Sequence, residues 1–565
     1  MESQQRNMIL AVLLSALVLF GWSALSSYWF PTANPPVTKI EEGQTKAVIP
    51  AGTPTRTVKR DRAELVAASP RVAIRNAKVV GSINLTGARI DDLTLPEHRE
   101  TIANDSPPIR LLSPEGAAKA YFASFGWSGE GVAVPGPDTV WTADRRELTP
   151  TTPVTLSWPN GQGQVFRIKI AIDDGYLFTV EQQVANTGAG AVAVRPYGLV
   201  SREGRSPDRD EWVAHVGPLG VFNAAANYDV DWDDLDEAGA AGTRFQSRGG
   251  WLGFGDKYWL TALAPGKDAA IDAGFRSAAG SYQADYALQP AIVAPGKAIS
   301  VTSRLFAGAK EVALLDDYED RYGIDKFGRA IDWGWFEVFE KPIFYYLDWV
   351  FKQVGNFGLA IIILTFTVRL IMFPIAQKQF ASMAGMRVVQ PKMKAIQERY
   401  KDDKPRQQQE IMALYKSEKI NPVAGCLPIL LQIPIFFALY KVLVLTIEMR
   451  HQPFVAWLHD LSAPDPMTPI NLFGLLDFTP PAMIAIGVLP IILGITMWMQ
   501  FKLNPAPTDP IQAQMFAIMP WVMMVIMAPF AAGLQLYWAT SNILTIAQQK
   551  WLYSKHPQMK AVVAS

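Results

Sequence analysis

The apolar run Gly355 to Pro374 is the feature that most constrains what this chain can fold into. At about 1.5 Å of rise per residue, a helix of about 20 residues covers the roughly 30 Å hydrocarbon core of a bilayer. We therefore expect this run to span a membrane. It carries one full charge, Arg369, in its last third. A charge at that depth costs about 2.5 kcal/mol or more and indicates a functional site. The alternative is that the long side chain reaches the near headgroups.

Composition supports a membrane protein of more than one domain. The chain has 565 residues, of which 49% are apolar and 18% charged, and this length exceeds what one hydrophobic core fills. Lys+Arg and Asp+Glu are both 52, so the balance gives no indication of nucleic-acid binding. From residue 331 onward the chain is basic and hydrophobic, while the first 330 residues are acidic.

Several site classes are absent from the sequence. A single cysteine, Cys426, rules out an intrachain disulfide and a cysteine-based zinc site. The five histidines form no metal-ligand pair, and no glycine-rich phosphate-binding loop is present. We therefore expect no metal, no cofactor and no enzymatic activity.

The N-terminal residues 1–30 are predicted to form a transmembrane anchor with the N-terminus in the cytoplasm. The apolar run Met8 to Phe30 ends in an aromatic cluster that suits the membrane interface. A cleaved signal peptide is the alternative, but the run is long for one and lacks a clean small-residue cleavage site. Residues 31–64, rich in Pro, Thr, Gly and charge, are expected to be a flexible linker.

Residues 65–330 change to a period of two. Phe166, Ile168, Ile170 and Ile172 alternate with polar or small residues, and Asp173-Asp174-Gly175 then predicts a turn into a second strand. The pattern predicts a large antiparallel β-sandwich. The acidic run Asp229 to Glu237 is interpreted as a solvated loop; calcium binding is the alternative, although the run lacks EF-hand spacing.

Residues 331–352 are dense in aromatics but carry several charges, among them Glu337, Glu340, Lys341 and Asp348, which predicts an amphipathic helix in the interface, broken at Pro342. A span at 354–375 follows. The segment 376–420 then holds ten basic residues against five acidic ones and reads as a cytoplasmic helical hairpin, because positive loops stay inside. The remaining segments are a span at 421–446, an outer loop at 447–482, spans at 483–501, 511–528 and 533–551, and a short tail at 553–565.

These segments make six spans with both termini in the cytoplasm and the β domain outside. The predicted spans contain no Asp or Glu in their hydrocarbon stretches, so Arg369 has no carboxylate partner there. The last span has a polar face made of Gln535, Trp538, Ser541, Asn542, Thr545, Gln548 and Gln549. Together with Thr365, Arg369 and Gln432 this face favours a shared hydrophilic groove. Ordinary hydrogen bonding between helices is the alternative.

The chain resembles the YidC/Oxa/Alb family of membrane protein insertases, in its Gram-negative form with a large periplasmic domain. The resemblance covers nearly the whole chain. Its motifs are ILTFTVRLIMFP (363–374), MRVVQPKMKAIQERY (386–400), ALYKSEKINPVAGCLPILLQIPIFFALY (413–440), FVAWLHDLSAPDP (454–466), GLQLYWATSNILTIAQQ (533–549) and GWLGFGDKYWL (250–260).

The resemblance implies a five-helix core around a hydrophilic groove and a periplasmic β-supersandwich of the sugar-mutarotase type. Arg369 matches the groove arginine of the family. The groove-lining positions are matched by Thr365, Gln432, Tyr537 and Trp538, and the apolar slide for a departing substrate helix by Ile433 and Phe436. Some relatives have a second tyrosine where this chain has Trp538.

The resemblance also implies partners. They are nascent membrane proteins, the Sec translocon, membrane lipids and, through the cytoplasmic hairpin, the signal recognition pathway. Because the tail carries only Lys555 and Lys560, we expect only weak ribosome binding through it.

Two other functions compete with an insertase. A secondary transporter for an anionic solute would usually show paired broken helices in internal repeats, and none is visible. A sugar-modifying enzyme in the β domain would need a positioned acid and base. His98 and His215 have no evident partners in the sequence.

Overall fold

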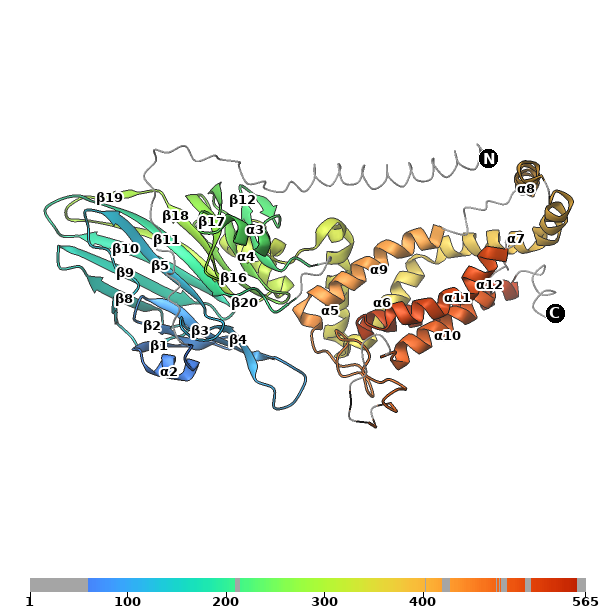
Figure 1. Cartoon of the computed structure of the whole chain (residues 1–565), viewed down its shortest axis with the longest axis horizontal. Coiled ribbons are helices and arrows are strands. Elements are labelled where there is room, and N and C mark those ends of the chain that lie inside the picture. Colours follow the sequence, from blue (N-terminus) through green and yellow to red (C-terminus); the bar gives the residue numbers. More distant parts are fainter. Residues whose placement is uncertain are drawn as a thin grey trace. The chain divides into compact units, whose positions relative to one another are not determined.

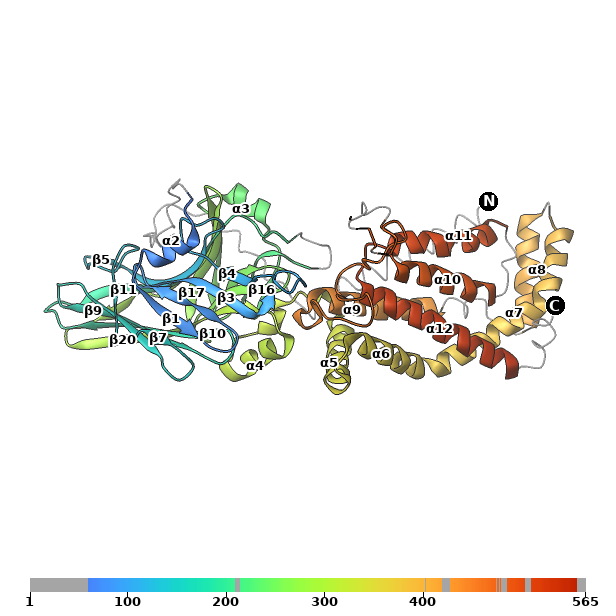
Figure 2. The ribbon, with the colours of Figure 1, turned by 90° about the horizontal axis from the view of Figure 1, so that it is seen from below.

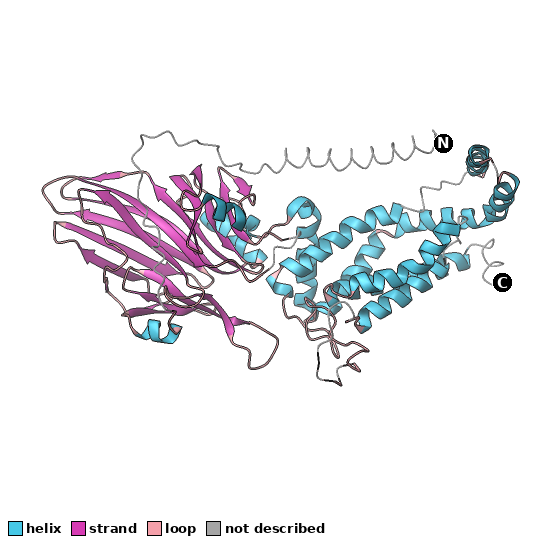
Figure 3. Cartoon of the chain, in the orientation of Figure 1, coloured by secondary structure: helices cyan, strands magenta, loops and turns pink. Residues whose placement is uncertain are grey.

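The computed structural model describes residues 59–208, 214–401, 403–418, 427–473, 475–476, 478, 485–503 and 510–555. The chain divides into two compact units, Met1–Asp332 and Trp333–Ser565. Strands gather in the first unit and long helices in the second (Figure 3). The predicted anchor at 1–30, the linker up to residue 58 and the end of the tail lie outside the described residues.

The first unit is built on two β-sheets, and the predicted β-sandwich is confirmed (Figure 1). Every ladder among the described strands is antiparallel except the short pairing of β1 with β7. One sheet runs β14 (Thr243–Arg248), β17 (Ala270–Ala278), β18 (Ser281–Leu288), β11 (Val192–Glu203), β5 (Tyr121–Glu130), β3 (Arg89–Arg99), β2 (Val80–Asn84), β1 (Arg71–Arg75) and β7 (Glu147–Leu148), with β19 (Ala291–Val293) on β11 and β4 (Pro108–Leu112) on β3. The other runs β13 (Ala225–Asn227), β12 (Gly217–Phe222), β15 (Trp251–Gly255), β16 (Trp259–Ala264), β20 (Lys297–Ala309), β10 (Leu177–Asn186), β9 (Gln164–Ile172), β8 (Val154–Pro159) and β6 (Thr142–Ala143).

The hairpin of β9 and β10 shows how the sequence period sets the register. Phe178 pairs with Ile172 and Val184 with Phe166, so the alternating apolar residues of both strands share one face. The predicted turn is confirmed. The Asp173 carboxylate accepts hydrogen bonds from the backbone N–H groups of Gly175, at 2.9 Å, and Leu177, at 3.0 Å.

Aromatic contacts join the two sheets. Trp127 on β5 and Phe166 on β9 pack edge to face with ring centroids 5.1 Å apart, and both are buried. Further along, Phe222 on β12 stacks on Phe245 of β14 at 4.1 Å. Such offset and edge-to-face pairs add specific geometry to the apolar burial that stabilises a sandwich.

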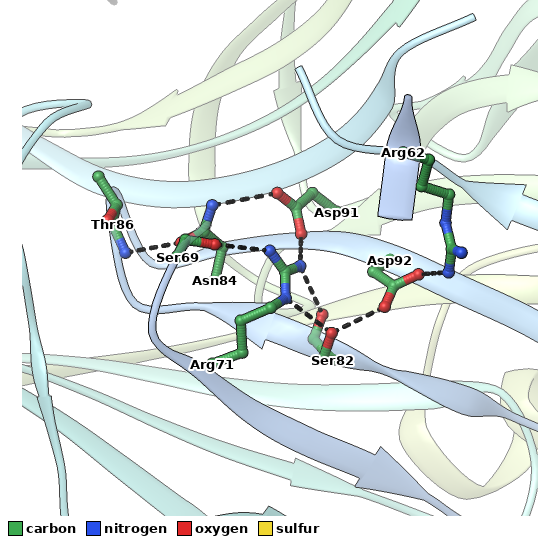
Figure 4. Close-up of polar contacts among 8 residues, drawn as sticks. All are labelled: Arg62, Ser69, Arg71, Ser82, Asn84, Thr86, Asp91 and Asp92. Atoms are coloured by element: carbon green, nitrogen blue, oxygen red, sulfur yellow. Dashed lines mark hydrogen bonds and ion pairs between the residues drawn. The ribbon is translucent and has the colours of Figure 1, made fainter. Parts of the chain in front are cut away.

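A buried polar network ties β1, β2 and β3 together (Figure 4). The Arg71 guanidinium pairs with Asp91 and donates to Ser82 Oγ at 2.7 Å. Ser82 in turn donates to Asp92 Oδ2 at 2.8 Å, and Asp92 pairs with Arg62 of α2 (Arg62–Ala67). Burial raises the pKa of the Asp91 carboxyl, and the charge of Arg71 opposes that rise. The network satisfies charges that would otherwise be costly to bury.

Most of the acidic run at 229–237 is helical, so the predicted loop is wrong. Residues Trp232–Ala238 form helix α3, whose N-cap Asp231 makes a reciprocal capping box with Asp234. Acidic side chains suit this position because the first turn of a helix favours negative charge. Within α3 the side chains of Trp232 and Leu235 are buried, and this burial explains why the segment forms a helix. No candidate metal cluster is found in the described part of the chain.

The helices after the sandwich are shown from a second side in Figure 2. They begin with α4 (Val312–Tyr322), which still belongs to the first unit. The second unit contains α5 (Glu337–Val354), α6 (Phe357–Ile371), α7 (Phe373–Arg399), α8 (Lys404–Ser417), α9 (Leu427–Leu445), α10 (Val488–Leu503), α11 (Pro510–Met527) and α12 (Ala532–Lys555).

Helix α5 departs from its prediction in two ways. It runs unbroken through Pro342, which lies in its second turn, so the predicted break there is wrong. A proline so near the helix start removes only one hydrogen bond of the ladder. The second departure is that Glu340, one of the charges from which an interfacial helix was predicted, is fully buried. Helix α5 packs on α6 and α9, and α9 contributes a buried Lys441.

Within the second unit, α12 packs against α6, α7, α9 and α10 and so occupies the centre of the bundle. Helices α5 and α8 lie at opposite ends of this bundle in both views (Figures 1 and 2). In the described part of the chain, no helix combines the length and apolar character that crossing a membrane requires.

Candidate functional site

The polar face of α12 meets Arg369 in the last turn of α6. Arg369 Nε donates to the Ser541 hydroxyl at 3.2 Å, and its Nη2 donates to the same oxygen. In the described ranges no carboxylate lies within salt-bridge distance of Arg369. The guanidinium is therefore held by a neutral oxygen, which satisfies donors without cancelling the positive charge.

A second contact lies one helical turn earlier on α12. Gln432 of α9 donates through Nε2 to the Tyr537 hydroxyl at 2.8 Å, and Tyr537 is buried. Because Tyr537 and Ser541 are four residues apart, they lie on the same face of α12. The side chains of α6 and α9 thus converge on neighbouring positions of one helix. We call Arg369, Gln432, Tyr537 and Ser541 the polar cluster.

An apolar contact adjoins the polar cluster. Phe436 on α9 and Trp538 on α12 pack edge to face with ring centroids 4.9 Å apart. Ile433, one turn before Phe436, has 55% of its surface exposed. Ile433 and Phe436 are the positions predicted for an apolar slide, and Ile433 is next to Gln432 in the chain.

Thr365 is placed differently from the other predicted groove residues. It is buried, and its hydroxyl donates to the Ile361 carbonyl of its own helix at 2.7 Å. At the ends of the α12 polar face the contacts go to the end of α11, to the turn after it and to α12 itself. Gln535 donates to the carbonyls of Met527 and Phe530, and Thr545 bonds to the carbonyl of Ser541. The middle of the stripe is where three helices meet.

Comparison of this chain with known proteins shows which family it belongs to. Residues 71–346 match the family described as YidC periplasmic domain, and residues 349–560 match the one described as 60Kd inner membrane protein. A protein of Zymomonas mobilis called membrane protein insertase YidC is 51% identical over 98% of this chain and 96% of its own length. The chain belongs to the YidC family of membrane protein insertases.

Other members of the YidC family are similarly close. The protein of that name from Methylobacterium nodulans is 44% identical over 98% of this chain and 96% of its own length. Among solved structures, one titled as an active YidC insertase with its first transmembrane domain resolved has a TM-score of 0.36 at 18% identity, covering 86% of this chain and 95% of that one.

Ser541 is the residue whose role the sequence did not single out. It was expected only to widen the polar face, whereas in this YidC family member it is the direct partner of Arg369. The signal was present as spacing, since Ser541 follows Tyr537 by one turn. Which of the many polar residues on α12 faces α6 depends on how the helices cross, and that is not written in the spacing.

In the predicted hairpin region, α7 and α8 pack against each other. Lys392 pairs with Glu418 at 2.6 Å, Gln407 donates to the Gln397 carbonyl at 2.8 Å, and Tyr415 Oη lies 3.0 Å from Met393 Sδ. Most of the charges on these helices remain on the surface.

The two histidines of the β domain lie in unrelated settings. His98 Nε2 is 3.3 Å from the Tyr176 hydroxyl, and its ring packs on Trp259. His215 Nε2 is 2.6 Å from the Pro218 carbonyl oxygen. Tyr176 donates to Glu311 at 2.9 Å, at the start of α4, so the His98 contacts tie this helix to the sandwich.

Proposed function

We propose that this chain inserts membrane proteins: it moves hydrophobic segments of newly made proteins from the cytoplasm into the inner membrane through a hydrated, positively charged groove. The observation that carries the proposal is the contact of Arg369 with Ser541. A cation held by a neutral hydroxyl keeps its charge available to attract acidic parts of a passing polypeptide. A polar lining also lowers the cost of bringing a hydrophilic segment into the bilayer.

The groove is proposed to be lined by Arg369, Thr365, Gln432, Tyr537 and Trp538. Ile433 and Phe436 would form the slide along which the hydrophobic segment leaves for lipid. The exposed Ile433 and the Phe436–Trp538 contact support this assignment, because they offer an apolar path beside the polar cluster. Release is driven by the transfer of the substrate's own apolar residues into hydrocarbon.

The proposed topology has six spans, with both termini in the cytoplasm and the β domain in the periplasm. The basic segment 376–420 would remain in the cytoplasm because positive loops are not translocated. Large apolar side chains cover the outside of α11, including Met515, Ile518 and Val525. Such a surface suits a lipid environment better than water.

The partners of this chain are proposed from its family membership. The substrates are nascent membrane proteins, handled alone or beside the Sec translocon, with recruitment through the α7–α8 hairpin and the signal recognition pathway. Ribosome contact through the short tail would be weak. No cofactor takes part, and the driving force is the partitioning of the substrate.

The test is insertion of a small single-span protein with an acidic outer segment into proteoliposomes that hold the purified chain and no ATP. Wild type is expected to insert it, and Arg369→Ala to lose most insertion. Lys550→Ala is the matched control, because Lys550 is an exposed cation on α12 outside the polar cluster. Equal insertion by wild type and Arg369→Ala would show that insertion does not require the charge of Arg369. Failure of wild type itself would favour the anionic-solute transporter.

A further inference from the structure

The loop between α9 and α10 carries a group of large, exposed apolar side chains. We call Ile470, Leu472, Phe473, Leu475 and Leu476 the apolar finger. All five are exposed, and Leu475 has 84% of its surface accessible. Contiguous exposed apolar residues of this size mark an interaction surface rather than ordinary surface variation.

The backbone of the finger is folded onto itself. Phe473 N–H donates to the Thr468 carbonyl at 2.8 Å, and Leu476 N–H donates to the Asn471 carbonyl at 3.0 Å. Leu472 and Phe473 adopt left-handed backbone conformations, with φ of 49° and 59°. Non-glycine residues hold such angles only where the surroundings fix them. Internal pairing also lets a backbone enter an apolar phase at low cost.

The base of the finger is anchored to the helix ends. The buried Asp465 accepts hydrogen bonds from Leu489 N–H at 2.7 Å and from Trp457 Nε1 at 2.9 Å. At the start of α12, Ala532 N–H donates to the Ala463 carbonyl at 2.8 Å. The finger is therefore presented in a fixed position at the ends of α10 and α12.

This end of the bundle lies opposite α8 in both views (Figures 1 and 2). If α8 is on the cytoplasmic side, the finger is on the periplasmic side. Helix α10, the next described helix in the chain, exposes Ile495 and Met499. That helix face is also proposed to contact lipid.

We propose that the apolar finger inserts into the outer leaflet of the membrane, its side chains reaching the boundary of headgroups and acyl chains; this inference rests on the proposed six-span function. Lipid fits the finger better than a protein partner. Its exposed tip is Leu, Ile and Phe, whereas protein interfaces concentrate their binding energy in Trp, Tyr and Arg. An interfacial element of this kind sits about 5–10 Å into that boundary.

The experiment places an environment-sensitive fluorophore at the tip. Leu475→Cys in a Cys426→Ser background is labelled and reconstituted, one chain per nanodisc, in phosphatidylcholine and phosphatidylglycerol. Nitroxide lipids, labelled at a shallow or a deep acyl position, report lipid contact, and aqueous iodide reports water. Matched sites are His459→Cys, exposed on the base of the loop, and Ile518→Cys, exposed on α11.

The expected result is strong quenching of the Leu475 label by the shallow nitroxide lipid, weaker quenching by the deep one and little by iodide. The His459 label should show the reverse preference for iodide. Iodide quenching at Leu475, together with nitroxide quenching at Ile518, would contradict insertion of the finger into the membrane. It would not contradict the proposed spans. Iodide quenching at both positions would overturn the proposed spans as well. Protection of Leu475 from both quenchers would also overturn the finger, because it would indicate cover by protein.

Discussion

Arg369 on α6 and Ser541 on α12 face each other across the bundle, with Arg369 Nε 3.2 Å from the serine hydroxyl. The partner is small and neutral, so the guanidinium is oriented and still charged. One turn away on the same helix face, Tyr537 accepts from Gln432. The geometry therefore brings one cation, Arg369, and three neutral hydrogen-bonding side chains together where α6 and α9 meet one face of α12.

A carboxylate at position 541 is expected to block the use of this cation. In Ser541→Asp the new charge would pair with Arg369 and compete with acidic segments of a substrate. An ion pair worth about 1.4 kcal/mol would lower insertion of an acidic substrate roughly tenfold. Insertion of a substrate with a neutral outer segment should change far less. Proteoliposome insertion of both substrates measures this, with Ser541→Asn as the neutral control.

The Gln432–Tyr537 hydrogen bond is expected to couple α9 and α12 only modestly. A double-mutant cycle of Gln432→Met and Tyr537→Phe should give a coupling free energy of about 0.6 kcal/mol, typical of hydrogen bonds between membrane helices. Reversible unfolding of the purified chain in mixed micelles measures it. Strict additivity of the two substitutions would mean that the bond contributes nothing to helix association.

Lys310, directly after β20, should make the β domain more stable as pH rises above 8. Burial lowers its pKa to about 8, against the attraction of Asp256, Asp208 and Asp332. Below that pKa the folded and unfolded states both bind the proton. Between about 8 and 10.5 the unfolded state binds more protons, so the free energy of unfolding rises, by up to about 3 kcal/mol.

Urea unfolding of the β domain within the full chain, followed by pulse proteolysis from pH 7.5 to 9.5, tests this effect. Wild type should gain stability over that interval relative to Lys310→Met, which has no titrating group at the position. Parallel pH profiles for the two proteins would contradict the prediction.

Asp465 is expected to hold the loop base and the start of α10 together. Asp465→Ala removes the acceptor for Leu489 N–H and Trp457 Nε1 and should cost about 2 kcal/mol, since both donors are left without it. Asp465→Asn keeps one acceptor oxygen and should cost less. Thermal unfolding of the two variants in the same detergent gives the order, and an equal loss for both would argue against the capping role.

Local patterns predicted the β domain well. The alternation from Phe166 to Ile172 and the turn at Asp173 require only neighbouring residues, because a strand must place its apolar side chains on one face. The same reasoning failed at the acidic run, where a loop was expected. The buried Trp232 and Leu235 anchor that run as a helix, and acidic residues near its start cap it rather than break it.

The candidate site was predictable in membership but not in pairing. The sequence indicated Arg369, Gln432 and the polar face of α12, since polar residues in apolar runs stand out. It did not indicate that Arg369 meets Ser541, that Thr365 bonds within its own helix, or that Glu340 is buried. Each of these depends on which faces of helices distant in the chain are pressed together.

The sequence by itself determined the order of segments, the family and the presence of Arg369 in an apolar run that holds no Asp or Glu, because hydrophobic period, charge and motif are local properties of a chain. Only the tertiary structure decided which hydroxyl accepts the hydrogen bond from Arg369. It also decided where the apolar finger lies relative to the helices. Helix crossing and loop anchoring arise from packing between residues far apart in sequence, such as Asp465 with Leu489 and Ala463 with Ala532.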